Sequence, residues 1–248
     1  MNKTKNERTL LENYLYEPKN SHAKESLINN RLFYDLKLAA ARRGYFLNIY
    51  RPEIDHEGFD IILDDGDSLL KIQLKTKMKN ASPNDLKIHK TLLRPNMDTH
   101  EDLGFEASPT GTGYQGGIIL IEVEDANELK VDYYYTDIIL ISGIEFEIVN
   151  IVNPPKKKKL MRFFKDLMTG MSHEKIKVPL KMLFKARSVD GLLALMGLHN
   201  NANTIGWRYH IQKMVSCHDE GELAAPQNAL KKFINEEINS ISDSIINP

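Results

Sequence analysis

The sequence of 248 residues contains a single cysteine and no long apolar run. Cys217 alone can form neither an intrachain disulfide nor a cysteine-based zinc site, which excludes a disulfide-stapled scaffold and a zinc finger. Apolar runs such as residues 118–121 and 192–196 are too short to span a bilayer. Since the first residues also lack the apolar stretch of a signal peptide, we expect a cytoplasmic protein that does not enter a membrane.

The sequence also has almost no net charge, and its formal value of −1 at pH 7 taken alone argues against a nucleic-acid partner. Along the chain, however, the charge is uneven. Residues 156–187 hold eleven Lys and Arg against two acids (+9), residues 1–155 hold 18 against 25 (−7), and residues 188–248 hold four against seven (−3). A basic segment of this kind can neutralise phosphates and gain affinity from counterion release, although a solvated helix face would have the same composition. The nucleic-acid-binding candidates in this segment are Lys156, Lys157, Lys158, Lys159, Arg162 and Lys165.

The spacing of apolar residues predicts an α/β or α+β chain. A helix is expected over residues 22–43, where apolar side chains recur every three or four positions. Strands are expected over residues 45–50, 59–63, 69–76, 117–124 and 131–141, a strand or short helix over 85–93, and helices over 160–168, 192–199 and 225–241. The turn sequence Asp64-Asp65-Gly66-Asp67 predicts an antiparallel hairpin between the second and third strands.

Three regions follow from this pattern. Residues 1–20 are expected to form an N-terminal helical extension, and residues 21–150 the α/β core. The character of the chain changes at Asn153-Pro154-Pro155, and residues 156–248 are expected to form a basic, mainly helical region.

The strand predicted over residues 69–76 carries the sharpest functional signal. Its side chains alternate between two faces, so that Leu70, Ile72 and Leu74 share one face. Gln73 and Lys75 share the other face and lie about 7 Å apart along the strand. The alternative interpretation is a solvent-exposed sheet face, which would explain each of these polar residues taken singly.

Two acids are expected near this pair. Asp60 interrupts the apolar neighbouring strand, and a buried, unpaired carboxylate would be costly. On a helical wheel, Glu25 falls on the stripe of Leu32 and Leu36 that should face the core. Two carboxylates with a Lys/Gln pair have the composition of a Mg²⁺ site for phosphodiester hydrolysis, in which the ion polarises the phosphate and a lysine assists attack by water.

The order of these elements resembles the core of the PD-(D/E)XK nuclease superfamily. The glutamine in place of the usual acid is similar to the Mrr-type restriction nucleases, whose motif is Q-x-K. The segment HEGFDIILDDGDSLLKIQLKTK at residues 56–77 carries most of the likeness, which covers residues 21 to about 141. The resemblance implies a restriction-endonuclease-like αβββαβ core with a mixed central sheet, followed here by a mainly helical C-terminal region.

The resemblance also implies roles for individual residues. Asp60 would be the principal metal ligand, Gln73 would stand in the second acidic position, and Lys75 would be the catalytic lysine. Glu25 would match a helix acid that some members use as a further metal ligand. The implied cofactor is Mg²⁺ or Mn²⁺. The implied partner is DNA, with RNA left open, and the implied assembly is a homodimer, since duplex cleavage by this fold usually needs two active sites.

The sequence departs from the family pattern at two positions. Phe59 stands where the family has proline, and Gln73 is neutral, so that Asp55 or Glu57 could supply a ligand instead. We therefore expect a Mg²⁺-dependent DNA endonuclease of restriction or anti-phage defence type. The alternative is a catalytically inert module that binds nucleic acid or a partner protein. Outside this region, Trp207 is expected to be a packing anchor rather than a base-stacking residue.

Overall fold

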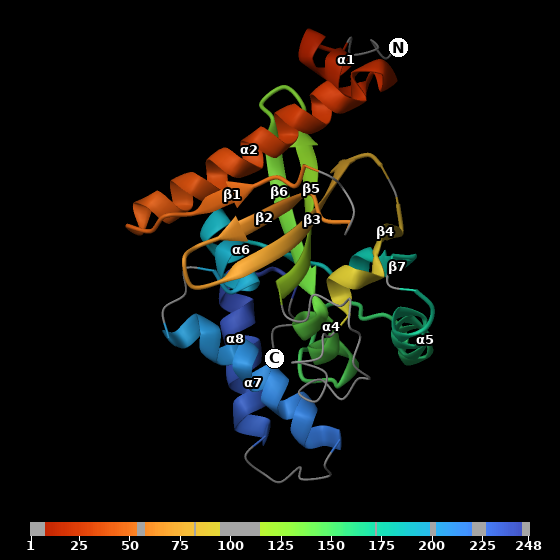
Figure 1. Cartoon of the computed structure of the whole chain (residues 1–248), viewed down its shortest axis with the longest axis vertical. Coiled ribbons are helices and arrows are strands. Elements are labelled where there is room, and N and C mark those ends of the chain that lie inside the picture. The colour runs from red at the N-terminus through yellow and green to blue at the C-terminus, as the bar shows by residue number, and fades with distance from the viewer. Residues whose placement is uncertain are drawn as a thin grey trace, which may run out of the picture.

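The computed structural model describes residues 8–53, 58–81, 83–94, 115–171, 173–198, 202–219 and 227–244. Within these ranges the chain has an α+β fold built on a six-stranded mixed sheet and a two-stranded sheet. Figure 1 shows the helices distributed around the larger sheet. The expected α+β class and mixed central sheet are therefore confirmed.

The larger sheet has the order β1-β2-β3-β5-β6-β8. Its strands are β1 (Asn48–Tyr50), β2 (Ile61–Asp64), β3 (Leu69–Met78), β5 (Gly116–Asp125), β6 (Lys130–Asp137) and β8 (Phe184–Lys185). Neighbouring strands are antiparallel except β3 and β5, which are parallel.

The predicted hairpin between β2 and β3 is confirmed, and its turn is held by aspartate side chains. Asp64 Oδ1 accepts a hydrogen bond from the Gly66 N–H (2.9 Å), and Asp65 Oδ1 accepts one from the Ser68 N–H (2.7 Å). Gly66 has φ +92°, a value that favours glycine. The turn sequence and the register of the two strands are thus set locally.

The predicted helix is present as α2 (Ser21–Arg42), which runs diagonally across the sheet with its N-terminal end beside α1 (Leu10–Tyr16) and η1 (Pro18–Asn20) (Figure 1). Ile28, Leu32 and Leu36 are fully buried, as the spacing predicts. On β6, the Tyr133 hydroxyl donates to Asp35 Oδ2 of α2 (2.7 Å). The face of the sheet that carries Tyr133 is therefore the face that α2 covers.

The strand predicted over residues 131–141 is too long, because the chain turns into α4 (Ile138–Glu145) after Asp137. The Asp137 side chain accepts a hydrogen bond from the Leu140 N–H (2.9 Å) and so caps the new helix. A short apolar run such as residues 138–141 does not by itself distinguish a buried helix from a buried strand.

The smaller sheet joins two distant segments. The expected strand or helix at residues 85–93 contains both, as β4 (Asp85–His89) followed by η2 (Lys90–Leu93). β4 pairs antiparallel with β7 (Lys175–Pro179), which comes after α5 (Lys157–Met168) and before η4 (Leu180–Met182). η2 contacts β3 and β5, so the smaller sheet is attached to the larger one.

The C-terminal residues complete the same core rather than a second one. β8 pairs with β6, and α6 (Val189–Met196), α7 (Ala202–Asp219) and α8 (Gln227–Ile241) follow it. One cluster of buried apolar residues extends from Ile28 of α2 to Ile238 of α8. The boundary predicted at residues 153–155 therefore does not separate two hydrophobic cores. Among the residues described, we find no helix both long and apolar enough to cross a bilayer.

Candidate active site

Asp60 lies directly before β2 and is attached to β3 by two hydrogen bonds. Its N–H donates to the Ile72 carbonyl (2.9 Å), and its Oδ2 accepts from the Leu74 N–H (2.6 Å). The residue that donates to the carboxylate is the one between Gln73 and Lys75. The structure therefore brings Asp60 to the Gln73-x-Lys75 segment, as the sequence predicts.

Gln73 and Lys75 lie on the face of β3 that points away from α2. Leu70, Ile72 and Leu74 are buried on the opposite face, so the predicted alternation is confirmed. The Gln73 side chain is only 6% exposed, and its Oε1 is buried without a hydrogen bond from any described residue. Lys75 is half-buried and has no ion-pair partner in the described ranges.

Glu25 does not join this group in the way that the helical wheel predicts. It is exposed, along with most residues of the first two turns of α2, because that end of the helix extends past the strands (Figure 1). In addition, α2 packs on the other face of the sheet from Gln73. The prediction that Glu25 faces the core is therefore wrong, and its role as a metal ligand stays a prediction. Asp55 and Glu57, the alternative ligands, lie outside the described residues.

An acidic cluster on the same face was missed by the sequence reasoning. Glu122 and Glu124 of β5 and Asp132 of β6 have carboxylate oxygens within 4.8 Å of one another. Strand register brings them together, since Glu122 pairs with Lys77 of β3 and with Asp132. A signal for this cluster was present in the sequence. Glu122-Val123-Glu124 places two acids on one face of a predicted strand, and the register of the next strand adds Asp132.

Each carboxylate of the acidic cluster is already bound to a lysine. Lys77 pairs with Glu122 (2.6 Å), Lys79 with Glu124, and Lys185 with Asp132 (2.7 Å). Glu122 also accepts a hydrogen bond from the Tyr134 hydroxyl (2.6 Å), and burial together with this bond raises the pKa of Tyr134. Three ammonium groups balance three carboxylates, so the cluster has the character of a structural network rather than of an ion site.

The segment that leads to Asp60 is packed against the smaller sheet. Gly58 has φ +77°, and a Cβ added there would lie 2.6 Å from His89 Cβ and would overlap the imidazole ring. His89 is the last residue of β4 and pairs with Lys175 of β7. The candidate active site therefore adjoins the end of the β4–β7 sheet, an adjacency that no local sequence pattern indicates.

The predicted nucleic-acid-binding residues lie on or directly before α5. Lys156, Lys157, Lys158, Lys159, Arg162 and Lys165 are all exposed. The opposite side of α5 buries Leu160, Phe163 and Leu167. This separation is what an amphipathic surface helix requires.

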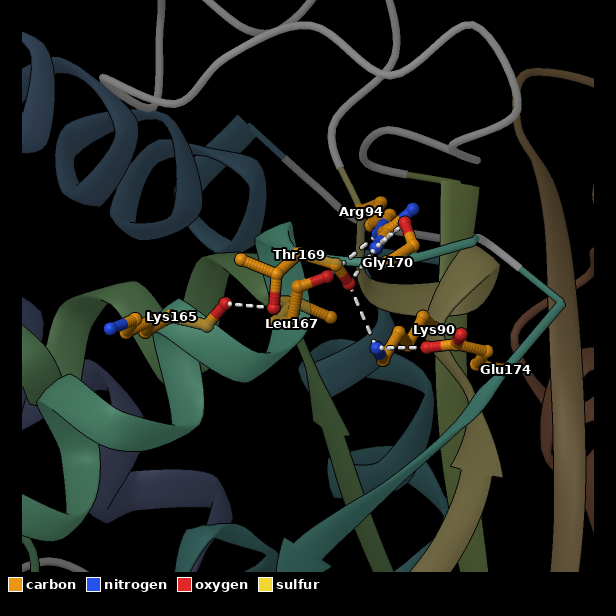
Figure 2. A network of polar contacts seen from close by, with 7 residues as sticks. All are labelled: Lys90, Arg94, Lys165, Leu167, Thr169, Gly170 and Glu174. Atoms are coloured by element: carbon orange, nitrogen blue, oxygen red, sulfur yellow. Dashed lines mark hydrogen bonds and ion pairs between the residues drawn. The ribbon is translucent and has the colours of Figure 1, made fainter.

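Two buried cations hold the C-terminal end of α5 against η2 (Figure 2). Arg94 donates to the carbonyls of Leu167 (2.7 Å) and Thr169 (2.7 Å), and burial lowers the pKa of Arg94. Lys90 donates to the Thr169 carbonyl (2.8 Å) and to Glu174 Oε2 (2.7 Å), which lowers the pKa of Glu174. These cations donate hydrogen bonds to carbonyl groups at the end of the helix, where intrahelical donors run out, and fix α5 relative to β4 and β7.

Trp207 is fully buried, which confirms the expected packing role. The neighbouring Arg208 is also buried and bonds to Asp137 and the Leu195 carbonyl. The Trp207 ring is therefore not available for contact with a base.

Comparison with protein-family models gives no match for this chain, and comparison with curated proteins gives none either.

Proposed function

We propose that the chain is a Mg²⁺-dependent endonuclease of the PD-(D/E)XK type, with a restriction-endonuclease-like core, that hydrolyses phosphodiester bonds of DNA in restriction or anti-phage defence. The observation that carries the proposal is the hydrogen bond from the Leu74 N–H to Asp60 Oδ2. It fixes the Asp60 carboxylate beside the strand residues Gln73 and Lys75, and Asp60, Gln73 and Lys75 are the three motif residues of the resemblance. The parallel pairing of β3 with β5 supports the same core.

The donor atoms present fit a hard divalent cation. Mg²⁺ binds oxygen ligands, and Asp60 supplies a carboxylate. Gln73 supplies a buried amide oxygen that accepts no hydrogen bond within the described residues, an arrangement that costs stability unless a ligand is bound. When bound, the ion would polarise the scissile phosphate and lower the pKa of water.

The side chains of the chain itself would do the remaining work. Asp60 and Gln73 would hold the ion, with the Asp60 carboxylate oriented by the Leu74 N–H. Lys75 has no ion-pair partner in the described part of the chain, so that its ammonium group would be available to stabilise charge on the phosphate or to orient the attacking water.

The second candidate function is an inert nuclease-fold module that binds nucleic acid or a partner protein. The observation in its favour is the small charge of the donor set. Asp60 is the one carboxylate that the described residues bring to Gln73, and Glu25 is exposed on α2.

Plasmid nicking with Mg²⁺ or Mn²⁺ separates the two functions. Asp60→Asn keeps the shape and an oxygen that accepts from Leu74 but removes the charge, while Lys75→Ala removes the ammonium group. Each should lower the nicking rate by about 100-fold or more. The matched control is Lys79→Ala, an exposed lysine directly after β3, which should nick at the wild-type rate. Circular dichroism verifies that all variants fold. Absence of nicking by the wild type over a range of metals and substrates would contradict the endonuclease proposal and favour the inert binding module.

A further inference from the structure

A groove of about 470 Å³ lies between α5 and β7, two elements that also lie side by side in Figure 1. Lys159 and Arg162 line it from α5, and Lys175 and Lys177 line it from β7. Asp166 is the one acid that lines it, and Arg162 lies 4.0 Å from that carboxylate. The groove is therefore strongly basic, and most of its charge is not balanced by nearby acids.

The lysines that line the groove on β7 have a further lysine beside them on β4, the other strand of the smaller sheet. Lys87 of β4 stands directly opposite Lys177, and both side chains are exposed. Like charges directly opposite each other on neighbouring strands destabilise a sheet. Neither lysine has an ion-pair partner among the described residues, so an anion bound beside them would relieve the repulsion.

The two walls of the groove are held in place. Arg94 and Lys90 bind the carbonyls at the end of α5, and Lys90 also binds Glu174, directly before β7 (Figure 2). Lys90 therefore contributes to the shape of the groove while its charge is paired with Glu174. A fixed spacing between two cationic walls reduces the entropy lost when an extended anion binds.

The groove also adjoins the candidate active site. Lys175 pairs with His89, whose ring lies against Gly58, two residues before Asp60. An extended polyanion that occupies the groove would pass close to the segment holding the Asp60 carboxylate. A row of phosphates fits this arrangement, since their charges recur along a strand.

We propose that this groove binds the sugar–phosphate backbone of a nucleic acid through Lys159, Arg162, Lys175 and Lys177, with Lys87 at its margin. Lys156, Lys157, Lys158 and Lys165, which the sequence also suggested, do not line the groove. Only the choice of a nucleic acid as the anion rests on the proposed nuclease function, because the groove itself is independent of catalysis.

Binding without cleavage tests the groove directly. The full chain is titrated against a labelled 20-base-pair duplex in EDTA, and fluorescence anisotropy is measured from 50 to 200 mM salt. Lys175→Gln/Lys177→Gln should weaken binding by about tenfold and lower the slope of log affinity against log salt by about 2. The matched control, Lys37→Gln/Lys130→Gln, removes two exposed lysines from α2 and β6 and should bind within about twofold of the wild type.

Four results decide the outcome. Lys175→Gln/Lys177→Gln should melt at or above the wild-type temperature in low salt, because it removes the repulsion between Lys177 and Lys87, and this excludes unfolding as the cause of weaker binding. Equal affinities and salt slopes for the two double variants would overturn the groove as the binding site. Displacement of the duplex by polyglutamate at equal charge concentration would overturn its assignment to nucleic acid. If the protein binds DNA through the groove but never nicks it, the groove is confirmed as the binding site and the proposed endonuclease activity is contradicted.

Discussion

Two groups of polar side chains share the face of the sheet that points away from α2, and they differ in how well they are paired. In the acidic cluster, Glu122, Glu124 and Asp132 each bind a lysine, and Glu122 also binds a tyrosine hydroxyl. In the candidate active site, Gln73 Oε1 accepts no hydrogen bond and Lys75 has no ion pair within the described ranges. Polar groups that are paired stabilise the fold, whereas a buried group left unpaired costs stability unless a ligand or water completes it.

The test with the largest expected effect on stability compares two buried side-chain amides, Asn235 and Gln73. Asn235 of α8 is 8% exposed, accepts from the Asn150 N–H (2.8 Å), and donates to the carbonyls of Ile148 and Lys231. Asn235→Leu should destabilise the protein by about 2–4 kcal/mol, because it leaves buried backbone groups without partners. Gln73→Leu should leave the stability unchanged or raise it by about 1 kcal/mol, since it removes an unpaired amide oxygen.

Urea denaturation of both variants gives the two values. If Gln73→Leu destabilises as strongly as Asn235→Leu, then Gln73 is part of the structural network and the comparison fails. If Gln73→Leu is stable and no longer nicks DNA, the position trades stability for function.

A second test compares two lysines on one strand. Lys77 and Glu122 are both largely buried, so Lys77→Met leaves a carboxylate with only the Tyr134 hydrogen bond and with two acidic neighbours. We expect a loss of about 2 kcal/mol in the free energy of unfolding. Lys75→Met, two residues away, removes no described ion pair and should change stability by less than about 0.5 kcal/mol.

The nicking activity of these two variants should change in the opposite order from their stability. Lys75→Met should abolish nicking of DNA, while Lys77→Met should retain it at temperatures where the variant is folded. Equal stability losses at the two positions would show that Lys75 has an ordinary structural partner.

The parts of the fold that the sequence predicted are those set by local contacts. The hairpin of β2 and β3 follows from a turn in which Asp64 and Asp65 bind the N–H groups of the next few residues. The two faces of β3 follow from strict alternation. The convergence of Asp60 with Gln73 and Lys75 was predictable for the same reason, since all three lie within one hairpin.

The parts that were missed depend on distant contacts. β4 pairs with a strand some ninety residues later, and neither strand has a local signal that names its partner. Glu25 lies at the correct angle on its helix but beyond the strands, and a helical wheel gives the angle without the position along the axis. The acidic cluster and the basic groove likewise exist only through the register of paired strands and the attachment of α5.

The smallest expected effect concerns the ion pair between Lys90 and Glu174, which holds the walls of the groove in place. Because both groups are paired, we expect them to stabilise the fold, as the acidic cluster does. The hydrogen bond from Lys90 lowers the pKa of Glu174 below its ordinary value of 4.5, so the ionised carboxylate stabilises the fold. This contribution is complete above pH 4.5 and is lost as the pH falls through the lowered value. Glu174→Gln should therefore lower the melting temperature slightly at pH 7, and the difference from the wild type should shrink steadily below pH 4.5. A difference that stays constant from pH 7 to pH 3 would mean that Lys90 is held by the Thr169 carbonyl alone, because only the Glu174 bond depends on that titration.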